Sequence, residues 1–596
     1  MKIKVIIVVM FLITVSGYSQ NTNPTYNEVV TELFRQYNAD SINQSNTILL
    51  EKREIGWKVT TINLVSNDTI SELFWDNQKK QYLQIGLPQN RTNEIDDDVI
   101  SNFINTSSPA RFNSLRYYGY VGWDQDLINL YQNKTVLTDS ELYSLGYAYS
   151  NYANGLLNDN FEFTDNKVKF NLPISANSMT DSQLQTYLSI EKKAINCYFE
   201  LYTRNPKFQT IPGQIGMKYF NEVASNFLNL RIYQNEEIAM KAIQDIDIYS
   251  DNYKLYVKYM LDSCDKNAIL FTVGDNDTFP LLIYQVQNNY RKDVLIVNTS
   301  LLQDERYAII MRNRILDSEG IPFSLSSDFI KDDMSEAVLF KTTTENEFPI
   351  ENLSIVLSDE KNFIEGTTRN YRTISSKHFS FGKGKQKIKW SIDGQALYRS
   401  DLIILDVIAT NNCKRPIYFA DYNSNEGYLG LSEYLQFEGL VYKLRRTKGT
   451  NPNSEIGYLN ATKTEENCSK MFQFKNKINL PVEERQLAMN YRSIYGRLAT
   501  NYIEEKQFEK AKANLDKGFK LYPNELSYFG FDVLTMLENY YKLKSFDTVK
   551  RIENQILQNL KNGYDNYCFL TDSEREYKYE LLKSQIEYLK SIYVKK

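Results

Sequence analysis

The fold is decided by the stretch Ala268-Ile-Leu-Phe-Thr-Val-Gly-Asp-Asn-Asp-Thr-Phe-Pro280. Residues 268–274 form a continuous apolar run, which is typical of a strand that is buried on both faces. A helical pattern follows Pro280 to about residue 289, and the apolar run at 293–298 predicts a second buried strand. A strand, a helix and a strand in this order predict a β-α-β unit with a right-handed crossover.

The residues after this unit extend it into a central domain at 265–445. Helices are expected at 304–317 and 398–411, and a third buried strand at 415–420. We therefore expect an α+β and α/β multi-domain fold whose centre is a small, mostly parallel sheet flanked by helices.

A polar, β-prone insertion occupies residues 320–395 of this domain. Its strand candidates are 338–340, 355–357 and 388–390. We expect it to pack as a β-ribbon over the strand ends of the sheet, where ligands usually bind in open α/β sheets.

Helical patterns flank the central domain, at 111–264 and at 485–596. Leu145, Gly146 and Tyr149 have the spacing of a tetratricopeptide first helix, and the second helix is expected at 191–206. An ordinary pair of antiparallel helices is the alternative. The C-terminal repeat is clearer, because eight residues fall at the repeat's spacing within a frame of about 34 residues. They are Tyr495, Leu498, Ala499, Tyr502, Ala511, Leu515, Gly518 and Pro523. Further helices are expected at 529–543, 546–560 and 573–593.

The N-terminal residues 1–20 are predicted to be a secretory signal. Lys2 and Lys4 precede the apolar run of 5–15, which is too short to cross a bilayer. An uncleaved anchor is the alternative.

A small mixed α/β unit is expected at 21–110, and a linker at 446–484. Since no later segment is apolar enough to cross a membrane, we expect a soluble mature chain in the periplasm or otherwise outside the cytoplasm.

The composition excludes several classes of function. The net charge is −5 and no basic block stands out, so nucleic acid is not an expected partner. His378 is the only histidine, which excludes a histidine-rich metal cage. The five cysteines are far apart and form no C-x-x-C pair, so neither a zinc site nor a redox site is expected.

The candidate ligand-binding residues follow the three predicted strands. They are Asp275, Asn276, Asp277, Asn298, Ser300 and Asp421. If the strands are parallel, these polar residues meet along one edge of the sheet and form a cleft. Asp275 and Asp277 could share a divalent cation. Alternatively, Asp277 caps the helix expected to begin near Thr278. No catalytic residue is predicted, and no cofactor is expected apart from this divalent cation.

Several motifs occur in the same order as in a known family. They are Gly274-Asp-Asn-Asp-Thr-Phe-Pro280, Asp293-Val-Leu-Ile-Val-Asn-Thr-Ser-Leu-Leu302, Leu405-Asp-Val-Ile-Ala409 with Arg415-Pro-Ile-Tyr-Phe-Ala420, and Tyr434-Leu-Gln-Phe-Glu-Gly-Leu-Val-Tyr442. With them, residues 260–445 resemble the soluble C-terminal part of bacterial multi-span membrane proteins that look like protein O-mannosyltransferases with a GT-C-type module. No segment of this sequence corresponds to that family's membrane-embedded catalytic half. The resemblance therefore implies the fold of an accessory domain and carries over no sugar-transfer residue.

The sequence favours a binding or assembly protein over an enzyme. The helical repeats are expected to bind a partner protein or peptide, or an envelope glycan. The alternative function is a carbohydrate-active or glycosylation-related enzyme or accessory factor with a metal site at Asp275 and Asp277.

Overall fold

A computed structural model describes most of the chain, as two units. One unit comprises Met1–Leu130 and Asn160–Val168, and the other comprises Tyr131–Asp159 and Lys169–Lys596. The described residues are 24–36, 46–53, 56–63, 69–76, 81–84, 93–107, 120–157, 178–210, 213–243, 246, 249–341, 346–365, 370–420, 425–449, 456–470, 480–563 and 572–594. The predicted signal segment 1–20 and the predicted site residue Asp421 lie outside them. The finer domain boundaries expected from the sequence stay a prediction.

The first unit contains an antiparallel sheet of four strands in the order β1-β2-β3-β4. Its elements are α1 (Tyr26–Gln36), β1 (Asn46–Arg53), β2 (Gly56–Asn63), β3 (Thr69–Asp76), β4 (Gln81–Gln84), α2 (Asp97–Ser107) and α3 (Trp123–Tyr131). Trp57 of β2 is fully buried, and its indole N–H donates to the carbonyl of Pro24 at 2.8 Å. The buried indole thus ties the sheet to the residues that precede α1.

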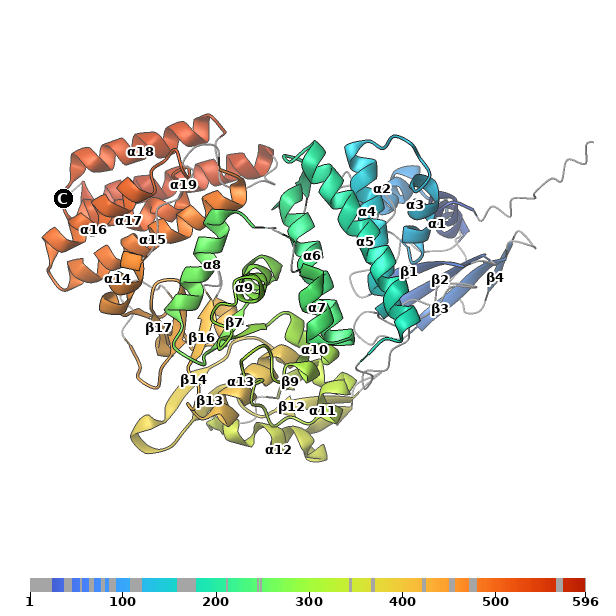
Figure 1. Cartoon of the computed structure of the whole chain (residues 1–596), viewed down its shortest axis with the longest axis horizontal. Helices are drawn as coiled ribbons and strands as arrows, with labels where there is room; N and C mark the ends of the chain where they lie inside the picture. The colour runs from blue at the N-terminus through green and yellow to red at the C-terminus, as the bar shows by residue number, and fades with distance from the viewer. Residues whose placement is uncertain are drawn as a thin grey trace, which may run out of the picture. The chain divides into compact units, whose positions relative to one another are not determined.

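In the second unit, helices precede the central sheet along the chain and helices follow it (Figure 1). They are α4 (Asp139–Leu157), α5 (Asp181–Arg204), α6 (Ile215–Tyr233), α7 (Glu236–Ile243) and α8 (Asp251–Ser263), and then α14 (Ala461–Lys470), α15 (Val482–Glu504), α16 (Phe508–Leu521), α17 (Leu534–Lys542), α18 (Phe546–Lys561) and α19 (Asp572–Tyr593). Helices therefore occur at every position where the sequence predicts them in these two segments. α4 packs against α5, and α15 packs against α16 and α17.

Glycines allow two of these helix pairs to approach closely. A Cβ atom on Gly146 of α4 would lie 2.9 Å from the ring of Tyr198 on α5. A Cβ atom on Gly518 of α16 would lie 2.8 Å from Cβ of Tyr495 on α15. Real Cβ atoms do not come this close to a neighbour, so a larger residue at either position would push the helices apart.

The central sheet of the second unit has six strands in the order β19-β17-β18-β16-β7-β8. They are β7 (Ile269–Thr272), β8 (Leu295–Asn298), β16 (Ile417–Ala420), β17 (Leu435–Phe437), β18 (Val441–Leu444) and β19 (Tyr458–Leu459). The three strands predicted from apolar runs lie side by side and pair in parallel, with Ile269 opposite both Leu295 and Ile417. β18 runs antiparallel to β16 and to β17, so the sheet as a whole is mixed.

Three helices accompany the strands of this sheet. They are α9 (Asp275–Gln287), α10 (Glu305–Ile310) and α13 (Arg399–Asn411). α10 is shorter than the helix expected at 304–317. The backbone at Leu316 has φ +53°, and Ile315 pairs with Ser318 in a tight turn, neither of which a continuing α-helix allows.

The insertion forms two small sheets of its own, in the orders β10-β13-β14 and β11-β12-β9-β15. Its elements are α11 (Ser327–Lys331), β9 (Ala337–Phe340), β10 (Phe348–Pro349), α12 (Leu353–Ser358), β11 (Phe363–Glu365), β12 (Asn370–Ile374), β13 (His378–Phe381), β14 (Ile388–Ser391) and β15 (Ala396–Tyr398). The strand predicted at 355–357 is wrong, because these residues belong to helix α12. Leu353 and Leu357 are one helical turn apart and fully buried, whereas Ile355 between them is 71% exposed.

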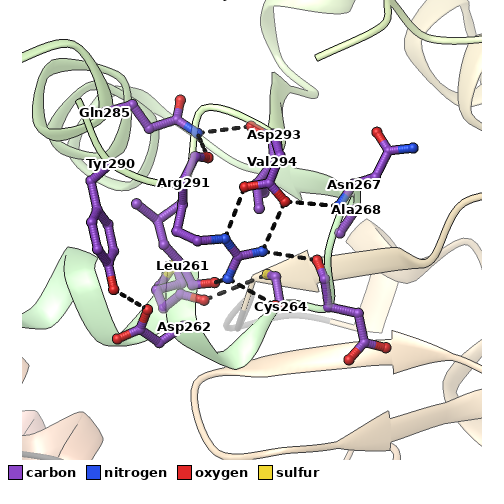
Figure 2. A network of polar contacts seen from close by, with 12 residues as sticks. Leu261, Asp262, Cys264, Asn267, Ala268, Gln285, Tyr290, Arg291, Asp293 and Val294 are labelled. Atoms are coloured by element: carbon purple, nitrogen blue, oxygen red, sulfur yellow. Dashed lines mark hydrogen bonds and ion pairs between the residues drawn. The ribbon is translucent and has the colours of Figure 1, made fainter. Parts of the chain in front are cut away.

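A network around Arg291 joins α8 to the residues just before β7 and β8 (Figure 2). The guanidinium forms a two-pronged contact with Asp293, at 2.9 and 3.2 Å, and donates to the carbonyls of Leu261 and Cys264 at 2.7 and 3.1 Å. Asp293 also accepts from the backbone N–H of Asn267 at 2.8 Å. The guanidinium thus adds a donor to the Leu261 carbonyl, which also accepts from the N–H of Cys264 at 3.2 Å, and gives the Cys264 carbonyl beyond the helix end a partner.

Candidate functional site

Helix α9 begins earlier than the sequence suggests. We call the turn from Gly274 into its first residues, which carries Asp275 and Asp277, the Asp275 loop. The helix begins at Asp275, and its N-cap is Gly274, which has φ +73° and provides no side-chain cap. Both aspartates therefore lie in the first helical turn, with exposed side chains. The prediction that Asp277 is the N-cap is wrong. The positive φ of Gly274, which glycine adopts readily, lets the helix begin at Asp275, so Asp277 already lies inside it.

Asn298 fixes this loop from the end of β8. Its side chain is fully buried, and its amide donates to Thr278 Oγ1 at 3.0 Å and to the carbonyl of Gly274 at 3.3 Å. Its Oδ1 accepts from the backbone N–H of Leu301 at 3.0 Å. Asn298 thus lies close to the Asp275 loop, as predicted, but its polar atoms hold the loop and are not presented to a ligand. Ser300 is exposed and contributes no side-chain cap to the short helix after it.

Asn276 connects the same loop to two helices. Its Oδ1 accepts from the side-chain amide of Asn221 on α6 at 2.9 Å. Its carbonyl cannot accept a helical bond from Pro280, because proline has no N–H group. The hydroxyl of Tyr253 on α8 donates to this carbonyl instead, at 3.3 Å. The first turn of α9 is therefore held against α6 and α8.

A pocket of about 360 Å³ opens where α5, α6, α8 and the start of α15 meet. It is lined by Tyr202, Pro206, Gln214, Gly216, Met217, Phe220, Tyr249, Ser250, Tyr253, Pro481 and Glu484. Successive rings contact one another, with centroid distances of 5.9 Å for Tyr202 and Phe220, 5.3 Å for Phe220 and Tyr249, and 5.5 Å for Tyr249 and Tyr253. We call this set of residues the aromatic pocket.

Two polar groups in the aromatic pocket are largely removed from water. The hydroxyl of Tyr249 is buried and has no hydrogen-bond partner among the described residues. Glu484 is 7% exposed, and its carboxylate accepts from the side-chain amide of Asn252 at 2.6 Å. A buried polar group without a partner is costly, so the Tyr249 hydroxyl would gain from a hydrogen-bond partner that reaches it.

The charge of Asp275 in the predicted site acts on Tyr249 of this pocket. Burial raises the pKa of the Tyr249 phenol, and the nearby negative charge of Asp275 raises it further. Desolvation also raises the pKa of Asp275, while the ammonium of Lys218 opposes that shift. Of the predicted residues, Asn276 is therefore hydrogen-bonded to Tyr253 of the pocket, and Asp275 acts on Tyr249 through its charge, but neither residue lines the pocket.

A buried charged cluster lies beside the pocket, between α5 and α6. Glu191 and Glu222 are 3% and 4% exposed, and Lys218 pairs with Glu222 at 2.7 Å. The ammonium also lies 4.9 Å from the ring centroid of Tyr198. Burial raises the pKa of Glu191 well above its usual range, and the negative charge of Glu222 adds to the effect. Burial lowers the pKa of Lys218, but its pairing with Glu222 outweighs this, so the ammonium stays charged.

Sequence reasoning missed both the aromatic pocket and the charged cluster. Their residues come from 191–253 and from 481–484, and no local motif connects these segments. The available signal was weak: Lys218 and Glu222 are spaced i, i+4 on one helix, and so are Tyr249 and Tyr253 across a helix start.

The metal interpretation has little support in the geometry. Within the part of the chain that the structure describes, no group of three or more histidine, cysteine, aspartate or glutamate side chains could hold a metal ion. Asp275 and Asp277 offer two carboxylates, and divalent cations in proteins usually take several more oxygen ligands.

Comparison with known proteins gives one match. The family model described as TMEM260-associated domain 2 matches residues 254–381 and 372–463, which run from α8 to the start of α14. This match is consistent with the resemblance of the central domain to a part of O-mannosyltransferase-like proteins. No curated protein and no solved structure matches the chain. Among the described helices, none combines the length and the apolar character needed to span a membrane.

Proposed function

We propose that this chain is an exported binding and assembly protein that holds a segment of a partner protein in the aromatic pocket. The observation that carries the proposal is the pocket itself, in which four rings contact one another in succession and one of them, Tyr249, has a buried hydroxyl without a partner among the described residues. Aromatic rings supply large contact areas at low cost in side-chain entropy, and a few fixed polar groups provide the orientation.

The helices around the pocket favour a peptide segment as the occupant. The α15/α16 pair carries the tetratricopeptide spacing from Tyr495 to Pro523, and repeats of this kind use extended concave surfaces for binding. Residues of α5, α6 and α8 form one wall of the pocket, and Pro481 and Glu484 at the start of α15 form another. A partner segment in the pocket would therefore contact both helical regions, and the predicted signal at 1–20 would place this interaction outside the cytoplasm.

A binding experiment with a matched control tests the proposal. The full chain, its Tyr202→Ala variant and its Tyr588→Ala variant are immobilised and exposed to an envelope extract. Tyr202 lines the pocket, whereas Tyr588 is 66% exposed on α19 and does not line it. A partner protein should be retained by the wild type and Tyr588→Ala but not by Tyr202→Ala. Equal retention by all three chains would exclude the pocket as the binding site.

The alternative is a carbohydrate-related factor, and it is favoured by the kind of protein that the family match names. Sugar rings also stack on aromatic side chains, so the same three chains are exposed to envelope polysaccharide. Retention of glycan and of no protein, lost in Tyr202→Ala, would replace the first proposal with this one. A cation requirement that disappears in Asp275→Asn with Asp277→Asn would restore the metal site as its mechanism.

A further inference from the structure

A second pocket, also of about 360 Å³, lies at the other end of the central sheet. It is lined by residues 413–417 at the amino-terminal end of β16 and by 443–447 at the end of β18, together with Phe381 and Ile388 of the insertion. The Asp275 loop follows the carboxyl end of β7, which is parallel to β16. The second pocket and the Asp275 loop are therefore at opposite ends of these parallel strands.

We propose that this second pocket binds a small organic anion, one that carries a phosphate or carboxylate group on a body with an apolar face. Five of the lining residues are cationic, and none is acidic, in a chain whose net charge is −5. They are Lys414, Arg415, Lys443, Arg445 and Arg446. A cavity lined by charges of one sign concentrates ligands of the opposite sign.

Two of these cations already have structural partners. Lys443 forms an ion pair with Asp265. Arg415 is 6% exposed and donates to the carbonyls of Asn267, Ala268, Glu319 and Gly320 and to the hydroxyl of Ser318. Its direct hydrogen-bond partners are therefore carbonyls and a hydroxyl, and the nearby carboxylate of Glu319 acts on it only through its charge.

Of the other three cations, Lys414 and Arg446 are available to a ligand. Arg445 already bonds to the side chain of Tyr458 and acts on the carboxylate of Glu438. Arg446 lies over the ring of Phe381, with its guanidinium carbon 4.6 Å from the ring centroid. It donates to the side-chain oxygens of Gln386 and Asn412 at 3.3 and 3.0 Å, but its buried Nε–H has no partner among the described residues.

This arrangement is suited to an oxyanion. A planar guanidinium that is already oriented by stacking loses little freedom when it binds phosphate or carboxylate. Ile388, Ile408, Ile417 and Leu444 supply an apolar wall of the same pocket, which would cover the body of the ligand. Inorganic phosphate alone would leave that wall unused, so an organic anion should bind more tightly.

Calorimetric titration of the full chain tests the assignment, with inorganic phosphate, glucose 1-phosphate and galacturonate as probes at constant ionic strength. Either of the two organic anions should bind saturably, and more tightly than inorganic phosphate. The first identifies a phosphate ester and the second a carboxylate. Arg446→Gln should weaken binding about tenfold. Arg551→Gln, which alters an exposed arginine of α18 outside the pocket, should change nothing. Lys414→Gln, at an exposed position, gives a second variant that keeps the fold.

Cys413 provides a readout of where the ligand lies. It lines the pocket and is exposed, whereas the other described cysteines are buried. A bound anion should slow alkylation of Cys413 by iodoacetamide, measured by peptide mass spectrometry, in the wild type and much less in Arg446→Gln. The assignment is overturned if neither organic anion binds saturably, or if binding leaves Cys413 unprotected and is equal in Arg446→Gln.

Discussion

Replacement of Arg291 by methionine should loosen the junction between α8 and the central sheet by about 3 kcal/mol. Arg291 and Asp293 are 21% and 28% exposed at their side chains, so the pair is mostly shielded from water. Hydrogen bonds to charged groups contribute about 1.5–3 kcal/mol each, and loss of one partner of a buried pair costs about 3–5 kcal/mol. The remaining contact with water places the expected loss at the lower end of that range.

Methionine is the appropriate replacement because the backbone at Arg291 has φ +43°. An unbranched side chain keeps the strain of this conformation nearly unchanged, whereas a β-branched one would add to it. The loss should therefore report on the guanidinium and its contacts with Asp293, Leu261 and Cys264.

Hydrogen exchange, followed by mass spectrometry on peptides that cover 261–298, measures this loss locally in a multi-domain chain. An opening free energy lower by about 3 kcal/mol makes exchange about a hundredfold faster in β7 and β8. The control is Lys241→Met, which removes an exposed pair with Glu237 and should cost under about 0.5 kcal/mol. If Arg291→Met exchanges within about threefold of the wild type, the network does not hold the junction and the reasoning is refuted.

Two further predictions concern α4, α5 and α6. Glu191 has a raised pKa, so its contribution to stability is fully present below about pH 4.5 and is lost as pH rises through its folded pKa, by up to about 1.4 kcal/mol per pH unit. Glu191→Gln should therefore raise the melting temperature at pH 8 more than at pH 5, and an equal effect at both would contradict a raised pKa. Gly146→Ala should destabilise the chain by about 1–3 kcal/mol, because the new Cβ would meet the ring of Tyr198 at 2.9 Å. A helix-interior glycine without such a contact gains about 0.5–1 kcal/mol on the same change, so stabilisation in a melting curve would refute the close approach.

The central strands could be predicted because their sequence signal is local. β7, β8 and β16 are short apolar runs in which every residue is buried, and the apolar run alone predicts that burial. The failure at α12 has the opposite origin. Ile355, Val356 and Leu357 form a β-like run, but the helix is decided by Leu353 and Leu357, which reach the core from one face.

The site could be predicted only where one loop determines it. The sequence placed Asp275, Asn276 and Asn298 together correctly, since two adjacent parallel strands end there. The sequence could not show that the side chain of Asn298 forms its hydrogen bonds within the loop, because those bonds depend on the φ of Gly274 and on the position of Thr278. The aromatic pocket could not be predicted from the sequence, because Tyr253 and Glu484 come together only when α8 packs against α15.

The position of β16 in the sheet has a consequence for how the chain is made. Arg415 at its start bonds to Asn267 beside β7, and 148 residues separate the two. During synthesis, β7 can pair with β8 early, but its other edge has no partner strand until the whole insertion and α13 have emerged. An unpaired apolar edge is a template for association with other chains. Premature termination anywhere between β8 and β16 should therefore yield aggregates and not a stable half-domain.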